Sequence, residues 1–281
     1  EQRAIAAYLD RSCAAIDAAI AAKRGQIESL ADIRKSLLQR VVTCGREDNP
    51  ALIATGNSWL EKIPRGWSLV MLKRLATIQG GITLGKDYST VATVEYPYLR
   101  VANVQDGYVD LADVTRLDVP PSIAAGVMLQ AGDVLMTEGG DLDKLGRGTV
   151  WEGQIAPCLH QNHVFAVRCL EHKLLPSFLA YVTASQYGRD YFEATGKRTT
   201  NLAATNATKV GMFYIPLPSL AEQHALVAYL DEELGRLTRI EKTIAQQIDT
   251  LLAYRKSLIH EYVTGKRRLA SADFTESQSH A

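Results

Sequence analysis

The sequence predicts an α+β fold in which a globular α/β domain is flanked by two long α-helices that pair as a coiled coil. The first observation is a repeat, because the pattern that begins at Glu1 begins again at Glu222. The second is a different residue pattern between the copies, where short runs rich in β-branched and aromatic residues alternate with glycine turns. The copies themselves have the spacing of amphipathic helices, so the chain reads as helix, mixed domain, helix.

The repeat stays in register without a gap. Its best-matched segments are Glu1-Gln2 with Glu222-Gln223, Tyr8-Leu9-Asp10 with Tyr229-Leu230-Asp231, and Arg34-Lys35-Ser36-Leu37 with Arg255-Lys256-Ser257-Leu258. Two unrelated amphipathic helices of similar composition would not keep such an alignment. We therefore interpret residues 1–43 and 222–265 as two copies of one helical unit.

Each copy carries an apolar stripe at steps of three, four or seven residues, which is the pattern of a helix–helix seam. The stripe of the second copy consists of Leu234, Leu237, Ile240, Ile244, Ile248, Leu251, Leu258 and Tyr262. That of the first copy consists of Ile16, Ile20, Ile27, Leu30, Leu37 and Val41. Because neither helix can bury its stripe alone, we expect the helices to pack lengthwise on each other, within one chain or between copies of it.

The remaining elements follow in order along the chain. We place a first helical region at 1–44, a polar connector at 45–62, the central domain at 63–218, a second helical region at 219–268 and a disordered tail at 269–281. Within the central domain, strands are expected at 96–104, 133–136, 149–151 and 163–167, and helical spacing at 175–191. Pro218 and Ser219 ahead of the acidic Glu222 predict the start of the second long helix.

Composition and charge exclude several classes of protein. There is no stretch of the length and apolarity of a transmembrane helix and no signal-peptide pattern, so we expect a cytoplasmic protein that does not bind membranes. The four cysteines lack a CxxC spacing and suit a reducing compartment, where they would fill core positions. Lys+Arg and Asp+Glu both number 31, and residues 63–214 hold 14 of each sign, so any contact with nucleic acid must be local.

A series of short motifs accompanies the repeated helix. In chain order these are Ile63-Pro64-Arg65-Gly66-Trp67, Gly132-Asp133-Val134-Leu135, His160-Gln161-Asn162-His163, Thr199-Thr200-Asn201-Leu202, Ile215-Pro216-Leu217-Pro218 and the second Glu-Gln helix. In this order the sequence resembles the specificity (S) subunit of type I restriction-modification systems. The resemblance covers nearly the whole chain, and the order together with the repeat carries it.

The resemblance implies a DNA-binding, non-catalytic subunit. Members of the family alternate a target recognition domain with a conserved helical region, twice over, and each recognition domain reads one half of a split double-stranded DNA target. This chain has a single recognition domain, so the resemblance implies a half-length or truncated S subunit, which could regain two readers as a homodimer. The implied partners are methyltransferase (M) subunits, which hold S-adenosylmethionine, and restriction-translocase (R) subunits, which use ATP and Mg. No cofactor is expected in this chain itself.

Two polar segments of the central domain have the chemistry for DNA contact. The glycine-rich segment 138–148 contains Gly139, Lys144 and Arg147, and glycines let the backbone approach phosphate or a groove edge. The alternative for this segment is a plain hairpin loop capped by acids. The second segment joins two cations to three hydrogen-bonding side chains: Lys197, Arg198, Thr199, Thr200 and Asn201. Its alternative is a solvated loop.

Weaker candidates for DNA contact complete the predicted site. These are Lys86, Tyr88, Arg100, Asn103, Gln161, Asn162 and Lys209. For the strand and His-Gln-Asn-His residues among them, packing or support of the sheet is the competing role. Cys158, His160, His163 and Cys169 match no usual zinc spacing, so we expect no metal.

Two other classes of function stay open. A DNA methyltransferase would need an Asn/Asp-Pro-Pro-Tyr/Phe run, and the nearest match, Asp48-Asn49-Pro50-Ala51, lacks the second proline and the aromatic residue. A nuclease would need more than the isolated Glu171-His172-Lys173. A coiled-coil scaffold that binds only protein explains the helices but not the polar loops of the central domain.

Overall fold

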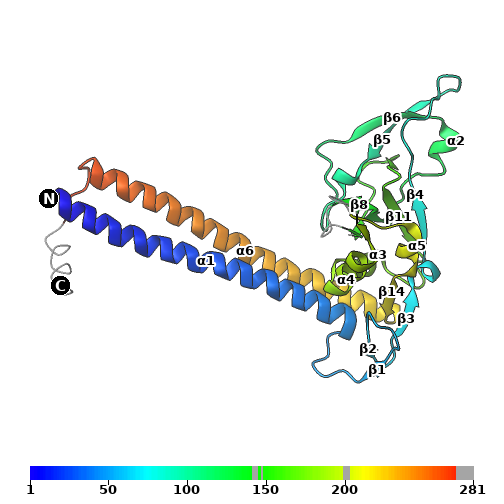
Figure 1. The fold of residues 1–281 in the computed structure, drawn as a ribbon, viewed down its shortest axis with the longest axis horizontal. Coiled ribbons are helices and arrows are strands. Elements are labelled where there is room, and N and C mark those ends of the chain that lie inside the picture. The colour runs from blue at the N-terminus through cyan, green and yellow to red at the C-terminus, as the bar shows by residue number, and fades with distance from the viewer. Residues whose placement is uncertain (141–144, 147, 199–202, 270–281) are drawn as a thin grey trace. The chain divides into compact units, whose positions relative to one another are not determined.

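A computed structural model describes residues 1–140, 145–146, 148–198 and 203–269. The chain forms two compact units. One joins Glu1–Arg34 to the chain from Glu232 onward, and the other is Lys35–Asp231. The two long helices, α1 (Gln2–Cys44) and α6 (Leu220–Val263), contribute residues to both units (Figure 1). The α+β class and both long helices predicted from the sequence are thereby confirmed.

In the first unit, α1 and α6 run antiparallel and pack lengthwise on each other. The rings of Tyr8 and Tyr262 lie 4.9 Å apart at one end, and Lys23 Nζ donates to Gln247 Oε1 at 2.6 Å near the middle. The buried seam consists of Ile16, Ile20, Ile244, Ile248, Leu258 and Tyr262. The predicted pairing of the two stripes is therefore confirmed.

The repeat gives this helix pair an approximate two-fold symmetry. Arg34 and Arg255 occupy the same position in the two copies, and so do Asp17 and Thr238. The guanidinium of Arg34 donates to Thr238 Oγ1 at 2.9 Å, while Nε of Arg255 lies 2.9 Å from Asp17 Oδ1. The same arginine thus makes the same cross-helix contact in both halves of the pair.

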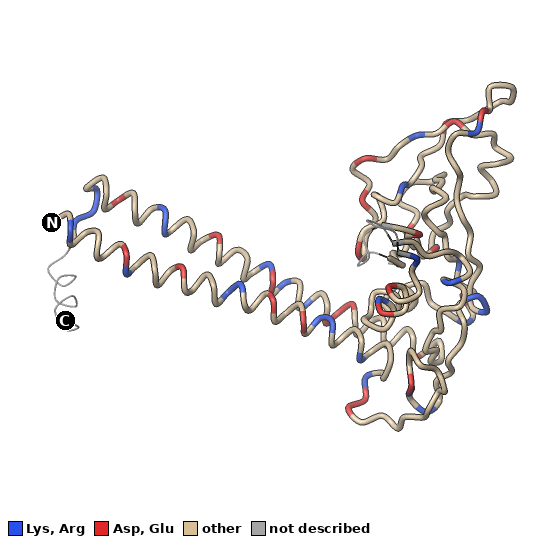
Figure 2. The backbone as a smooth tube through the Cα atoms, viewed as in Figure 1, with Lys and Arg blue, Asp and Glu red and all other residues tan. Residues whose placement is uncertain are grey.

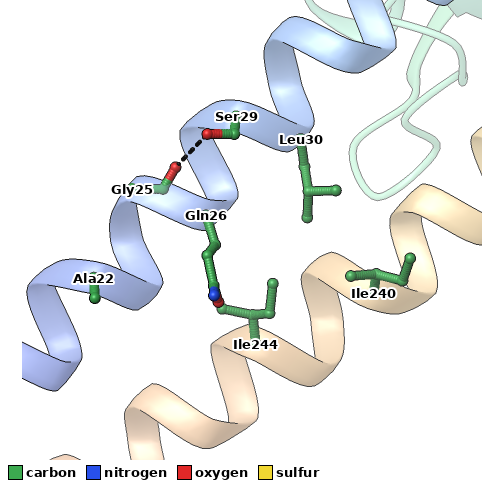
Figure 3. A pocket seen from close by; sticks show the side chains of 7 residues that line it. All are labelled: Ala22, Gly25, Gln26, Ser29, Leu30, Ile240 and Ile244. Carbon is green, nitrogen blue, oxygen red and sulfur yellow. Dashed lines mark hydrogen bonds between the residues drawn. The ribbon is translucent and has the colours of Figure 1, made fainter.

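One predicted seam residue is exposed. Ile240 keeps 38% of its surface accessible, because the facing stretch of α1 presents small residues such as Ala22 and Gly25. An open hollow of about 520 Å³ remains there, lined by Ala22, Gly25, Gln26, Ser29, Leu30, Ile240 and Ile244 (Figure 3). The side chains at this point are too short to fill the space between the helices.

The second unit begins at Lys35, within α1. Leu38, Val41 and Val42 of α1 are buried, as are Leu226 and Leu230 of α6. The expected connector contains a short hairpin, β1 (Leu52–Ala54) with β2 (Lys62–Pro64), since the apolar run at 52–54 can pair in register with 62–64. Strand β3 (Ser68–Met71) then pairs with β14 (Tyr214–Leu217), which leads directly into α6.

Gln223, at the start of α6, joins this helix to the segment before α3 and to the turn at Pro218. Its side chain is fully buried, its Oε1 accepts from Leu175 N at 2.9 Å, and its Nε2 donates to the carbonyls of Lys173 and Pro218. Trp67 Nε1 also donates to Glu222 Oε1 at 2.9 Å. The Glu-Gln pair therefore fixes the start of the helix to the rest of the unit.

The main sheet of the second unit is antiparallel, in the order β4 (Ala76–Gly80), β11 (Val164–Cys169), β7 (Val134–Thr137), β9 (Gly148–Val150). All four residues of β7 are buried, because helix α3 (Pro176–Ala184) packs on β7 and β9 while Leu135, on the opposite face of β7, packs in a core with Leu99 and Trp151. Helix α5 (Ala207–Met212) packs on β4 and on the short helix η1 (Leu72–Arg74). The expected strands at 133–136, 149–151 and 163–167 correspond to β7, β9 and β11.

A smaller sheet has the order β10 (Leu159–His160), β5 (Val94–Leu99), β6 (Thr115–Val119). Short helices η2 (Val101–Asn103) and α2 (Pro121–Ala124) lie after β5 and β6. The core of this region contains Ile82, Tyr98, Val119, Ala124 and Leu159. The expected strand at 96–104 thus ends at Leu99, where η2 takes over.

The helical spacing at 175–191 contains a break that the sequence analysis missed. Helix α3 ends before Ser185, whose hydroxyl caps a new helix, α4 (Gln186–Thr195), by accepting from Gly188 N at 3.3 Å. Serine competes well for helix N-termini, so one apolar pattern is divided between two helices. Among the described residues, no helix combines the length and apolarity needed to cross a membrane.

Candidate nucleic-acid interface

A three-stranded ribbon brings together the two segments that the sequence analysis selected for DNA contact. It consists of β8 (Gly139–Gly140), β13 (Ala203–Ala204) and β12 (Lys197–Arg198), with β13 in the middle. Ala204 is the partner of Gly139 on one side and of Lys197 on the other. The glycine-rich segment and the Lys-Arg segment therefore belong to one sheet, joined through β13, although they lie far apart in sequence.

Two glycines pack closely at the ends of these segments, Gly146 against the buried ring of Phe192 and Gly196 against Leu145 and the Phe192 backbone. A Cβ on Gly146, where φ is +69°, would lie 2.3 Å from Phe192 Cγ. A Cβ on Gly196 would lie 2.7 Å from Leu145 Cδ2 and 2.9 Å from the Phe192 carbonyl oxygen. Larger residues at either position would push one segment off the other.

Replacing Gly146 with alanine should lower the free energy of unfolding by about 2 to 4 kcal/mol, since strain at positive φ adds to overpacking against Phe192. Gly56 is the matched control, because its φ is +73° but no atom lies within 4 Å of a Cβ built there. Gly56→Ala should cost only the backbone strain, about 1 to 2 kcal/mol. Urea denaturation of both variants measures the difference, and equal costs would mean that the contact with Phe192 contributes nothing.

Glu138 connects the ribbon to the turn that precedes β11. Its backbone N donates to the His163 carbonyl at 2.8 Å, and its carbonyl accepts from Thr205 N at 2.7 Å. Its carboxylate Oε2 lies 2.5 Å from His163 Nδ1. The His163 side chain is 54% exposed and that of Glu138 is 26% exposed. The pair therefore lies at the surface, at the start of the glycine-rich segment.

Lys209 stabilises the end of α4 just before the ribbon. Its Nζ donates to the Thr195 carbonyl, and its own carbonyl accepts from Tyr191 Oη at 2.8 Å. Asn206 caps α5 by accepting from Lys209 N at 2.9 Å. Lys209 thus stabilises the backbone at the end of α4, which leads into Lys197 and Arg198 of β12.

The other predicted residues separate into buried and surface positions. Asn103 is buried, and its amide accepts from Arg100 N and donates to the carbonyls of Asp110 and Asp113. Arg100 forms a 2.7 Å ion pair with Asp113, and Gln161 Oε1 accepts from Val101 N at 3.4 Å. Asn103, Arg100 and Gln161 are therefore engaged in holding the loop that follows β5.

Lys86 is exposed on the loop between β4 and β5, while the hydroxyl of Tyr88 is buried and has no hydrogen-bond partner among the described residues. Asn162 is partly exposed beside His163, and its backbone N donates to the Ile82 carbonyl at 3.0 Å. Lys144, Arg147, Thr199, Thr200 and Asn201 lie outside the described residues. Basic and acidic residues are both scattered over the tube of the second unit (Figure 2), in agreement with the balanced count for residues 63–214.

Comparison with known proteins identifies the family. Residues 64–250 match the family model described as the type I restriction modification DNA specificity domain. The chain belongs to this family. The resemblance inferred from the motifs and the repeated helix is confirmed.

Relatives of this specificity domain are longer than the chain. It is 22% identical over 207 residues to the type I restriction enzyme StySPI specificity subunit of Salmonella potsdam, covering 73% of this chain and 44% of that protein. A chain solved in a study of complex assembly and conformational transition of the type I R-M system has a TM-score of 0.69 at 19% identity, covering 93% of this chain and 58% of that one. The HsdS subunit from Thermoanaerobacter tengcongensis has a TM-score of 0.57 at 17% identity, covering 93% and 57%. The chain thus spans about half the length of these proteins.

Beneath the surface of the specificity domain, a buried polar network supports β7, β10 and β11. Asp133, whose side chain is 1% exposed, accepts two hydrogen bonds of 2.8 Å from the Arg168 guanidinium and one from Gln130 N. His160 is fully buried, with its Nδ1 2.6 Å from the Val164 carbonyl oxygen. Burial also raises the pKa of the Cys158 and Cys169 thiols to about 12, which keeps them protonated. Among the described residues, no group of three His, Cys, Asp or Glu side chains is placed to hold a metal ion.

The stability of the specificity domain should depend on the protonation of His160. Burial lowers the pKa of this imidazole below its usual 6.5. As the pH falls through about 6.5, the unfolded chain takes up a proton that the folded chain does not, so the free energy of unfolding should decrease until the folded pKa is reached. Thermal unfolding between pH 7.5 and 5 tests this. His160→Asn keeps a donor near the Nδ1 position and should flatten the dependence, whereas an unchanged slope would assign it to other groups.

The sequence analysis did not predict the contact between Glu138 and His163, although both residues belong to motifs that it selected. Both stand at the edge of a candidate segment, where a sequence gives no sign of which side chains meet. The only available signal was the position of Glu138 immediately before the two glycines of β8.

Proposed function

We propose that the chain reads one half of a bipartite double-stranded DNA target on behalf of a type I restriction-modification complex. It carries no catalytic residue of its own, and methylation and cleavage belong to M and R subunits that hold S-adenosylmethionine, ATP and Mg. The observation that carries this proposal is the ribbon β8–β13–β12, because it joins the two DNA-contact segments within a chain of the DNA specificity family. DNA as the ligand implies that the chain works in the cytoplasm.

In this proposal, the chain contacts DNA through a small number of charged and hydrogen-bonding groups that the fold holds in position. Residues 63–214 carry no excess of positive charge, so bulk electrostatics would give weak binding. A ribbon that carries Lys197 on β12 and backbone glycines on β8 can position phosphates locally. The remaining affinity then comes from M subunits bound to the same complex, and this is the reason to propose that the chain acts only within an assembly.

The proposal includes a homodimer or a bound M subunit on the helical region. In the second unit, Leu226 and Leu230 of the second repeat copy are 2% and 0% exposed. Their equivalents in the first copy, Ile5 and Leu9, are only partly buried in the first unit. The first copy thus retains apolar surface that its counterpart covers, which supports an additional partner at that position.

The second candidate function is a protein-binding coiled-coil scaffold without DNA specificity. The open hollow beside Ile240 favours it, since an exposed apolar surface on a helix pair suits a partner helix. It gives no role to the ribbon, so we rank it below the DNA reader. A DNA-modifying enzyme ranks last.

The experiment that separates these functions combines the chain with M subunits and measures binding to a randomised duplex library and the methylation motif. We expect enrichment of one motif, and a symmetric motif if the chain dimerises. The double variant Lys197→Ala/Arg198→Ala should weaken binding by about 2 to 6 kcal/mol and reduce the salt slope. The matched control is Lys62→Ala/Arg65→Ala, which removes two exposed cations beside β2 and should leave the motif unchanged. Absence of any enriched motif would contradict the DNA reader and favour the scaffold.

A further inference from the structure

The Glu138–His163 pair has a chemistry that a simple surface ion pair lacks. A contact of 2.5 Å between Oε2 of the carboxylate and Nδ1 of the ring requires a proton between the two atoms. A carboxylate can only accept, so Nδ1 is the donor in this contact. In the neutral imidazole the other nitrogen, Nε2, is then left as an acceptor.

The backbone fixes this pair at the edge of the ribbon. Glu138 bonds through its N to His163 and through its carbonyl to Thr205, the residue after β13. Glu138 is also followed directly by β8, which pairs with β13. The imidazole, which is 54% exposed, therefore lies beside the edge of the ribbon where β8 begins and β13 ends.

We propose that His163 is a specificity-determining residue whose Nε2 accepts a hydrogen bond from the exocyclic amino group of one base, and that Glu138 positions the ring and sets its tautomer. This inference rests on the proposed function of the chain as a DNA reader. In the major groove, adenine N6 and cytosine N4 present amino donors, whereas guanine and thymine present O6 and O4 as acceptors at the corresponding place. An imidazole held with a bare Nε2 selects the first kind of base edge and rejects the second.

The carboxylate is essential to this selection because it can only accept. Glu138→Gln has nearly the same shape, but its amide can donate to Nδ1 as well as accept from it. The tautomer is then no longer fixed, and Nε2 can be either donor or acceptor. At the position read by His163, we expect Glu138→Gln to admit guanine and thymine alongside the original base, with the rest of the motif retained.

The test uses the chain assembled with M subunits and compares the selected motif of the wild type, Glu138→Gln and His163→Ala on the randomised duplex library. His163→Ala should reduce discrimination at one position by about tenfold, which corresponds to one hydrogen bond. Glu138→Gln should relax the same position. Duplexes that carry adenine or cytosine there identify which amino group is read. Thermal unfolding of each variant reports its folding, and His163→Gln, which places an amide near the Nε2 position, replaces any variant that does not fold.

The matched control is Glu95→Gln, which alters an exposed carboxylate paired with Arg116 at 2.9 Å in the same unit. It should leave every position of the motif unchanged. An unchanged motif in both His163 and Glu138 variants, or a uniform loss of affinity for all duplexes, would overturn the inference while the wild-type motif still supports the DNA reader. A wild-type complex with no motif would instead overturn the proposed function.

Discussion

Replacing Asp133 with alanine should lower the free energy of unfolding by about 3 kcal/mol, a large fraction of the stability of an ordinary domain. The carboxylate accepts three hydrogen bonds of 2.8 Å, two from Arg168 and one from Gln130 N. Its loss leaves the Gln130 backbone donor without this partner and removes two of the hydrogen bonds of the Arg168 guanidinium. The cost lies near the lower end for broken buried pairs because the Arg168 side chain is 35% exposed and can reach water.

Urea denaturation measures this cost, and Asp113→Ala provides the control. Asp113 pairs with Arg100 at 2.7 Å, but its side chain is 86% exposed. Removing an exposed partner should change stability by no more than about 1 kcal/mol. If Asp113→Ala proved as costly as Asp133→Ala, burial would not be the reason for the effect.

Replacing Ile248 with aspartate should destabilise the helix pair by about 2 to 5 kcal/mol. Ile248 is 9% exposed and lies in the seam with Ile16, Ile20 and Ile244. The substitution removes buried apolar area and places a charge between the helices without a partner. In a denaturant titration, the helical circular dichroism signal of the variant should therefore be lost at a lower denaturant concentration than that of the wild type.

Leu252→Asp is the control for the seam, since Leu252 lies one turn further along α6 and is 44% exposed. It should leave the stability of the isolated chain within about 0.5 kcal/mol. A similar loss in both variants would indicate general helix destabilisation by aspartate, and a near-neutral effect of Ile248→Asp would contradict the buried seam.

The helices could be predicted from the sequence because their signal is local. The stripes of both copies recur at helical spacing, and the seam residues that this spacing selects, such as Ile16 and Ile248, are buried. The antiparallel sense of the pair could not be predicted. A repeat in register fits either sense, and the choice depends on how the intervening unit joins the end of α1 to the start of α6.

The two segments of the candidate site could be predicted from the sequence, but the strand pairing that joins them could not. Lys197 and Gly139 were selected for their chemistry, but the strand pairing that joins them through Ala204 uses backbone groups, which every residue has. Asn103 shows the converse difficulty. An asparagine after a strand suits DNA contact, yet here its amide is used to hold a loop, because side-chain amides satisfy backbone groups equally well.

The seating of Gly146 and Gly196 around Phe192 has a practical meaning for engineering. Any redesign of the two candidate segments should keep Gly146, Gly196 and Phe192, because these residues join the segments to the rest of the second unit. A replacement that extends past these residues would remove the support together with the segment. Phe192 and the two glycines therefore mark the boundary between the supporting structure and the segments that a redesign would exchange.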